Sequence, residues 1–148
     1  MTANQLATRQ SAEVLEAALA ALHTPKAGSF LPAIESALKR EPANPQLWQV
    51  HGLIQRQLDR REIAIASLRR AQELAPAAPG IAHSLARTLF EAGMPSLSEY
   101  GRALELAPGE PEIISGMTSA LVAAGEIDAA IAGLDQILSR SPLWVEGH

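Results

Sequence analysis

Residues 42–79 read PANPQLWQVHGLIQRQLDRREIAIASLRRAQELAPAAP, and this stretch decides the fold. It carries a Pro-x-x-Pro motif at each end, formed by Pro42 with Pro45 and by Pro76 with Pro79. Proline inside a helix loses a hydrogen bond, but it is tolerated just after one helix and in the first turn of the next. Each motif therefore marks the end of one helix and the start of another.

The motif returns along the chain at a nearly fixed interval. A third pair is formed by Pro108 and Pro111, and a single Pro142 follows. From Pro42, the successive intervals to Pro76, Pro108 and Pro142 are 34, 32 and 34 residues. Such a period is typical of a solenoid of helix pairs, in which each pair packs against its neighbours.

A second break inside each period divides it into two helices. The first helices are expected over about 46–57, 80–92 and 112–124, and the second over about 60–74, 97–106 and 127–140, with an earlier helix over 3–22. Asp59 with Glu62, and Ser96 with Glu99, have the spacing of a capping box. We therefore expect these pairs to begin two of the second helices.

The residues at the expected helix contacts resemble those of the tetratricopeptide repeat. That family places a bulky residue early in the first helix, small residues where the two helices meet, and a proline at the end. The chain has such residues at Trp48, Gly52, Ala64, Leu68, Ala71, Ala82, Leu85, Ala86, Leu89, Tyr100, Ala103, Ile114, Met117, Leu121, Ala130, Leu134 and Ile137. The resemblance implies an all-α fold, a right-handed α–α superhelix of about four helix pairs.

The same resemblance implies a single domain over residues 1–148. Its repeats would be a degenerate one over 3–42 and then 45–78, 79–110 and 111–142, with 143–148 as the start of a further helix. The unit 79–110 is two residues short, and the loss falls at the turn before Ser96. We therefore expect its second helix to be about half a turn shorter.

Composition narrows the possible functions. The chain has no cysteine, 3% aromatic residues and a net charge of −4, which together argue against disulfides, thiolate metal sites and nucleic-acid binding. No apolar run reaches the roughly 18 residues of a membrane span, and the N-terminus lacks the features of a signal peptide. We therefore expect a cytoplasmic protein that binds neither nucleic acid nor membranes.

The polar residues do not have the spacing of a catalytic or metal site. His23, His51, His83 and His148 match no metal-ligand motif, and we expect His51 to be structural. We expect no catalytic residue, no metal and no cofactor. An arginine cluster is interpreted as a solvated, ion-paired face, with a nucleic-acid patch and a surface for an acidic partner as alternatives; it comprises Arg56, Arg60, Arg61, Arg69 and Arg70.

The first helix of each pair in such a solenoid lines the concave side, where side chains three or four residues apart face a partner. The candidate peptide-binding groove combines polar groups, two arginines and one aromatic ring. Its residues are Gln49, Leu53, Arg56, His83, Arg87, Phe90, Ser115, Ser119 and Val122. A groove of this kind can hold an extended peptide or a helix through hydrogen bonds and an apolar anchor.

The leading functional hypothesis is a non-catalytic scaffold that binds a peptide or protein segment in this groove. The first alternative is an N-terminal recruiting or regulatory domain of a larger, possibly enzymatic, protein. The second is self-association through the open end of the last repeat, where Leu143 and Trp144 would be the exposed apolar contacts and would form a homo-oligomer.

Overall fold

The computed structural model describes residues 2–125 and 131–136. The described residues form helices joined by short connections, and none of those helices is long and apolar enough to cross a membrane. The chain divides into two compact units, Met1–Ala77 (unit 1) and Ala78–His148 (unit 2). Their division falls between the second and third expected repeats.

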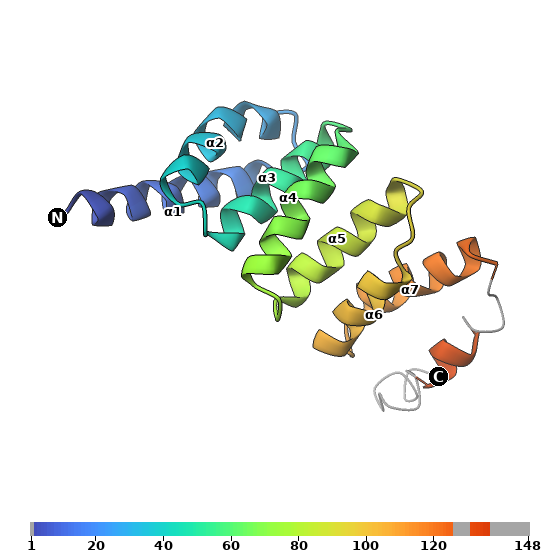
Figure 1. Ribbon diagram of the computed structural model, residues 1–148. Helices are drawn as coiled ribbons and strands as arrows, with labels where there is room; N and C mark the ends of the chain where they lie inside the picture. Colours follow the sequence, from blue (N-terminus) through green and yellow to red (C-terminus); the bar gives the residue numbers. More distant parts are fainter. Residues whose placement is uncertain (1, 126–130, 137–148) are drawn as a thin grey trace. The chain divides into compact units, whose positions relative to one another are not determined.

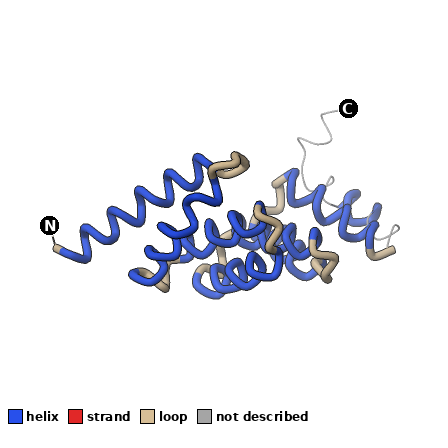
Figure 2. The backbone as a smooth tube through the Cα atoms, turned by 90° about the horizontal axis from the view of Figure 1, so that it is seen from above, coloured by secondary structure: helices blue, strands red, loops and turns tan. Residues whose placement is uncertain are grey.

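Unit 1 contains two helix pairs. Its elements are α1 (Ala3–Ala21), the short 3₁₀ helix η1 (Ala27–Phe30), α2 (Leu31–Arg40), α3 (Pro45–Gln57) and α4 (Arg61–Leu74) (Figure 1). Unit 2 contains α5 (Pro79–Glu91), α6 (Leu97–Leu106) and α7 (Pro111–Ala123) (Figure 1). Figure 2 shows the loops between consecutive helices. The helix expected over 127–140 falls on described residues only at 131–136, and those residues are helical.

Proline opens the first helix of each pair from α3 onward. Pro45, Pro79 and Pro111 are the first residues of α3, α5 and α7, as the repeated motif predicts. Proline has no backbone N–H, but an N–H at the first position of a helix would have no partner within the helix, so nothing is lost, and the fixed φ of proline suits a helix. The Asn44 side chain before α3 also accepts hydrogen bonds from the backbone N–H groups of Gln46 and Leu47, at 3.0 and 3.3 Å. These features fix where the helices start.

The first helix of each pair ends in a left-handed residue. Asp59, Gly93 and Gly125 follow α3, α5 and α7 with φ of 63°, 71° and 78°. After α3, the backbone N–H of Asp59 donates to the carbonyl of Arg56 at 3.0 Å, and that of Arg60 donates to the carbonyl of Gln55 at 2.9 Å. This is the pattern of a Schellman motif. Two of these turns therefore use glycine, which adopts this conformation without steric cost, and one uses aspartate, while His23 takes the same place after α1 with φ of 68°.

The predicted capping boxes are wrong. Arg60, rather than Asp59, is the residue before α4, and it makes no side-chain cap hydrogen bond. Asp59 lies one residue earlier in the left-handed turn, where its carboxylate is 3.2 Å from the guanidinium of Arg61. Ser96 does precede α6, but its φ of −131° and ψ of −3° differ from the extended backbone typical of a cap, and no cap hydrogen bond forms.

One cluster of core residues in unit 1 lies among α1, α2 and α3. Its buried residues are Ala18, Ala27, Leu31, Ile34, Ala37, Leu38, Leu47, Val50 and Ile54. The side chain of Gln57 joins α3 to the turn after α1. Its Oε1 accepts from the backbone N–H of His23 at 2.8 Å, and its Nε2 donates to the carbonyl of Thr24 at 2.7 Å. The end of α3 therefore holds the preceding helix pair in place.

A glycine lets α3 and α4 pack closely. A Cβ at Gly52 would lie 2.8 Å from Cγ of Leu68 and 3.1 Å from the backbone carbonyl oxygen of Ala64. Leu68 is fully buried. Side-chain crowding of this kind leaves room only for glycine. The small residues at positions 52 and 64 therefore set the approach of the two helices, as the sequence predicts.

Unit 2 packs α6 between α5 and α7. One cluster of its buried core residues comprises Ala82, Ala86, Tyr100, Ala103, Ile113 and Ala120. Helix α6 has 10 residues and α4 has 14. The difference of four residues is more than one helical turn, whereas a difference of half a turn was expected. The turn before α6 contains Pro95 and ends at Ser96.

Candidate functional site

A hollow of about 500 Å³ lies on unit 2 and is lined mainly by α5 and α7. We call it the α5–α7 hollow. Its lining combines charged, hydroxyl and aromatic side chains with one bare stretch of backbone. The lining residues are His83, Arg87, Phe90, Glu91, Tyr100, Pro111, Glu112, Ser115, Gly116 and Ser119.

Helix α5 supplies one wall of the hollow, with charged and aromatic groups. His83, Arg87 and Phe90 are spaced by four and three residues, so they lie on one helix face. The guanidinium of Arg87 is 3.9 Å from the Glu91 carboxylate, and the two side chains are 53% and 32% exposed. An ion pair this long and this exposed contributes little to stability. Arg87 can therefore leave Glu91 for a ligand at small cost.

Helix α7 supplies the opposite wall through Glu112, Ser115 and Ser119. The Ser119 hydroxyl donates to the backbone carbonyl of Ser115 at 3.1 Å, so it is held against the helix. Ser115 and Ser119 are both exposed and are one turn apart. Their small side chains leave this wall open to a ligand.

Between the walls, Tyr100 of α6 fits against Gly116 of α7. A Cβ at Gly116 would lie 2.8 Å from Cζ and from Oη of Tyr100, and closer still to Cε1. Tyr100 is 2% exposed, and its ring centroid is 6.3 Å from that of His83. The hollow therefore has a packed aromatic base, and its depth depends on glycine at position 116.

The structure brings five of the nine predicted groove residues into this hollow: His83, Arg87, Phe90, Ser115 and Ser119. Val122, on α7, is 49% exposed and does not line it. Gln49, Leu53 and Arg56 are half-buried on α3, in unit 1. The predicted self-association residues Leu143 and Trp144 lie outside the described ranges.

Several lining residues were missed by the sequence analysis. Glu91 is four residues after Arg87, and Glu112 is three residues before Ser115, so helical spacing alone places both beside predicted residues. Tyr100 was expected only as core. Its contact with Gly116 joins helices from two repeats, and no local pattern predicts it.

Two further hollows lie in the described part of the chain. One, of about 520 Å³, is formed in unit 2 by Phe90, residues 93–99 and the alanines at 120, 123 and 124 of α7. The other, of about 490 Å³, lies between α1 and α2 in unit 1, with Glu13 and Arg40 among its lining residues. Phe90 lines both hollows of unit 2, so this ring can anchor a ligand from either side.

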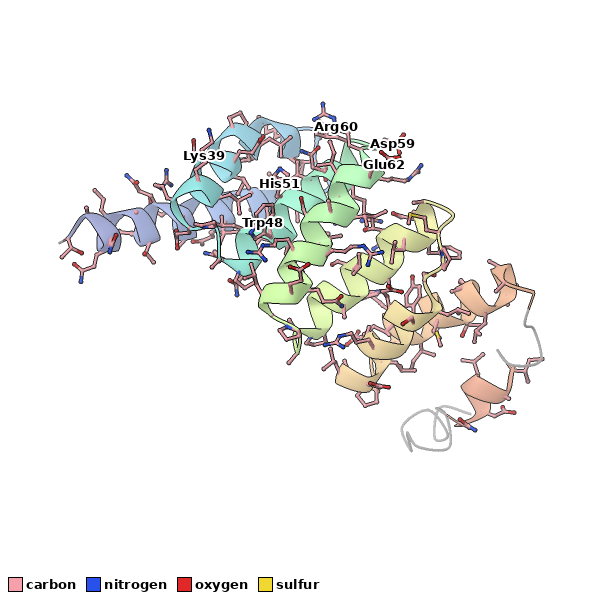
Figure 3. The ribbon with its side chains drawn as sticks, in the orientation of Figure 1. Lys39, Trp48, His51, Asp59, Arg60 and Glu62 are labelled. Atoms are coloured by element: carbon pink, nitrogen blue, oxygen red, sulfur yellow. The ribbon has the colours of Figure 1, made fainter. Side chains whose placement is uncertain are left out.

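A buried polar cluster joins α3 and α4 in unit 1. Nδ1 of His51 lies 2.7 Å from the Ser67 hydroxyl, and its Nε2 lies 3.5 Å from Nε2 of Gln55. Burial lowers the pKa of His51, and the negative charge of Glu35 acts in the opposite direction. The Trp48 ring packs edge-on against His51, and its Nε1 donates to the carbonyl of Pro42 at 2.8 Å (Figure 3). These contacts agree with the structural role expected for His51.

The arginine cluster of unit 1 includes the predicted ion pairs. Arg61 lies 3.2 Å from the carboxylate of Asp59, and Arg70 lies 3.0 Å from that of Glu73. Arg60 donates to the side-chain oxygen of Gln55 at 3.4 Å. Figure 3 shows Asp59, Arg60 and Glu62 at the turn between α3 and α4. Among the residues described, no group of three His, Cys, Asp or Glu side chains is placed to hold a metal ion.

Solved structures are similar to this chain in fold. A crystal structure of MamA protein aligns with a TM-score of 0.79 and 14% identity, over 91% of this chain and 75% of that one. A MamA AMB-1 structure aligns with a TM-score of 0.71 and 20% identity, over 85% and 70%. A mutant O-GlcNAc transferase of Thermobaculum terrenum aligns with a TM-score of 0.72 and 24% identity, over 82% of this chain and 23% of that one.

No family model and no curated protein sequence matches the chain. The predicted fold class is therefore confirmed by the similar arrangement of helices and not by similarity of sequence. The arrangement of the described helices agrees with that of the structures that align. The chain has the fold of the tetratricopeptide-like helical solenoids.

Proposed function

We propose that the protein is a non-catalytic interaction module that binds a peptide or protein segment in the α5–α7 hollow. The observation that carries this proposal is the hollow of about 500 Å³ itself, with five residues from α5 and α7 that were predicted to face a partner. Side chains on rigid helices hold their positions without a ligand, which reduces the entropy lost on binding. The likeness to tetratricopeptide-like structures supports a binding role through fold alone.

The lining groups suit recognition of an extended segment. Arg87 offers a guanidinium that can donate to backbone carbonyls or to a carboxylate, and Glu112 offers an acceptor on the other wall. The half-buried Phe90 ring offers an apolar contact between them. Apolar contact combined with a few placed polar groups is the usual composition of a ligand site.

The hydroxyl groups of the site support binding rather than nucleophilic catalysis. Ser119 donates to the carbonyl of Ser115, so its proton is directed at the helix backbone and not at a general base. Exposed Ser115 is on the same wall. We therefore assign both serines a steric role, in which their small size keeps the hollow open.

Filling the hollow tests the proposal. A peptide is first selected from a displayed library with the complete chain, and its affinity is then measured for Ser119→Trp and for Glu105→Trp. Ser119 lines the hollow, whereas Glu105 is exposed on α6 outside it. We expect Ser119→Trp to weaken binding at least about tenfold, equivalent to about 1.4 kcal/mol, and Glu105→Trp to leave it unchanged.

The two variants also define the opposite result. Equal affinities for both, with helix content preserved in circular dichroism, would place the peptide elsewhere and exclude this hollow as the site. Loss of binding in Glu105→Trp alone would have the same meaning.

A second candidate function is a recruiting module within a larger protein. The alignment with the O-GlcNAc transferase covers only 23% of that chain, so a similar helical array can form one part of an enzyme. The reading frame on both sides of these 148 residues tests this candidate. A catalytic domain in the same frame would support it, and stop codons at both ends would contradict it.

Self-association through Leu143 and Trp144 stays a prediction. Sedimentation of the wild-type chain and of Trp144→Glu at several concentrations checks it. Dimers that disappear in the variant are the expected result, and a wild-type chain that stays monomeric throughout would contradict it.

A further inference from the structure

The two units carry opposite net charges. Residues 1–77 contain nine basic and seven acidic side chains, a net charge of +2, whereas residues 78–148 contain three basic and nine acidic side chains, a net charge of −6. The overall charge of −4 therefore conceals an acidic unit 2. Charge on one part of a protein attracts ligands of the opposite sign and repels those of the same sign.

The α5–α7 hollow shares this acidic character. Glu91 and Glu112 line it, one on each helix, and Arg87 is the one lysine or arginine among its described lining residues. The guanidinium of Arg87 is already 3.9 Å from Glu91, so its positive charge is partly offset within the hollow. The lysine, arginine and carboxylate side chains that line the hollow therefore carry a net charge of −1.

The aromatic residues of the hollow add a second attraction for a cation. The Phe90 ring is half-buried beside Arg87 and Glu91 along α5, and it leaves part of its surface accessible. An ammonium or guanidinium group over an aromatic face is attracted by the ring quadrupole. The long apolar stem of lysine or arginine can also lie along the ring while the charged end reaches a carboxylate.

Resting on the proposed function, we propose that the α5–α7 hollow selects a peptide segment that presents a lysine or arginine side chain. The cationic end lies at the carboxylate of Glu112 or Glu91, and the stem lies along Phe90. An acidic segment is disfavoured because unit 2 repels it. The basic arginine cluster of unit 1, by contrast, would repel the segment that the hollow attracts.

Peptide pools that differ at one position test this selection. Each pool contains labelled nine-residue peptides with Lys, Arg, Gln or Glu fixed at the centre, and the other eight positions are drawn from Ala, Leu, Ser and Phe. We expect the complete chain to retain the Lys and Arg pools about two- to fivefold more than the Gln pool, which is the range for one exposed ion pair, and the Glu pool least. The preference should weaken as salt is added.

Two charge-matched variants show whether the hollow is responsible. Glu112→Lys and Glu105→Lys change the net charge of the chain equally, but only Glu112 lines the hollow. We expect Glu112→Lys to abolish or invert the preference and Glu105→Lys to keep most of it. Glu112→Gln, which removes the charge with little change of shape, should reduce the preference in the same direction.

The Ser119→Trp variant separates this inference from the proposed function. If all pools bind equally and Ser119→Trp prevents their binding, the hollow binds peptides but does not select for charge, and the inference is overturned alone. If binding is insensitive to Ser119→Trp, both are overturned. Equal effects of Glu105→Lys and Glu112→Lys would also overturn the inference, because the preference would then reflect net charge.

Discussion

The α3–α4 pair of unit 1 and the α5–α6 pair of unit 2 follow one pattern but make room for a large side chain differently. Leu68 of α4 and Tyr100 of α6 occupy equivalent positions in their repeats, once the two-residue deletion before Ser96 is counted. Leu68 fits against Gly52 in its own pair, whereas Tyr100 fits against Gly116 in the next helix. The position of the glycine thus shows which neighbour the large side chain packs against.

This difference has a functional consequence. In unit 1 the space beside Gly52 is filled by Leu68 and by the backbone of α4. In unit 2 the Tyr100 ring extends to α7 and forms the base of the α5–α7 hollow. A larger side chain at the same repeat position thus links two successive repeats and helps to form a site.

Breaking the contact between Leu68 and Gly52 in unit 1 should have the largest effect on stability. Leu68→Ala is expected to lower the free energy of unfolding by about 2–5 kcal/mol, because Leu68 is fully buried. Gly52→Ala alone should cost about 2 kcal/mol through overpacking, since Leu68 and the Ala64 carbonyl leave no room. In the Leu68→Ala background, Gly52→Ala should cost clearly less than it does alone, because only the Ala64 carbonyl then remains close.

Urea unfolding of the two single variants and of the double variant measures this coupling. Additive effects of the two substitutions would show that glycine at position 52 serves backbone flexibility rather than close packing. The comparison of the two pairs would then lose its basis in unit 1.

The matching test in unit 2 should give a smaller effect. Gly116→Ala is expected to cost about 1 kcal/mol, because the atoms in its way are at the outer end of the Tyr100 ring, which can swing aside more easily than backbone. Tyr100→Leu should relieve that cost. Thermal unfolding of both variants and their combination checks this. If Gly116→Ala lowers stability equally in the Tyr100→Leu background, the contact between Tyr100 and Gly116 is not the cause of its cost.

Exchanging the turn residues should change stability less again. Asp59→Gly should raise the free energy of unfolding by about 0.5 kcal/mol, because a left-handed backbone is strained for aspartate. Gly93→Asp should lower it by about 1 kcal/mol in the equivalent turn of unit 2. Chemical unfolding of each variant compares the two turns. A loss of stability in Asp59→Gly would show that the ion pair of Asp59 with Arg61 outweighs the strain.

A change of pH should have the smallest effect on the stability of unit 1. The negative charge of Glu35 offsets part of the lowering of the His51 pKa by burial. The pKa of His51 is lowered in the folded chain from 6.5, so the unfolded chain takes up the proton at higher pH. The free energy of unfolding should therefore fall as the pH decreases below about 6.5, and level off once the folded histidine is also protonated. Unit 2 has Leu85 at the equivalent position.

A double variant isolates this contribution. His51→Leu with Ser67→Ala removes the titrating ring and the hydroxyl that pairs with it. Urea unfolding at pH 7.5 and pH 5.5 should show a smaller difference in this variant than in the wild type. An unchanged difference would assign the pH dependence to other groups.

Local patterns predicted the positions of the helices well and the capping of the second helices poorly. The prolines at positions 45, 79 and 111 begin their helices, because the missing N–H is tolerated only in the first turn. The capping prediction for Asp59 failed because it rested on the three-residue spacing to Glu62. That spacing is the same whether the backbone at Asp59 is extended, as a cap requires, or left-handed, as it is here. Backbone conformation at a turn depends on both helices that it joins.

The α5–α7 hollow was predicted in part for a similar reason. His83, Arg87 and Phe90 share one face of α5 through spacing that is visible in the sequence. Their partners Tyr100 and Gly116 come from two other helices, and only packing brings them together. The exposed Val122 has suitable spacing from Ser119 but lies outside the hollow.

The sequence by itself determined the repeat and the proline starts of the first helices, because proline geometry and helical period are properties of residues taken singly or in short runs. The tertiary structure decided which glycine receives which large side chain and how deep the hollow is. Those features depend on distances between helices, and close packing fixes such distances only when the helices are in place.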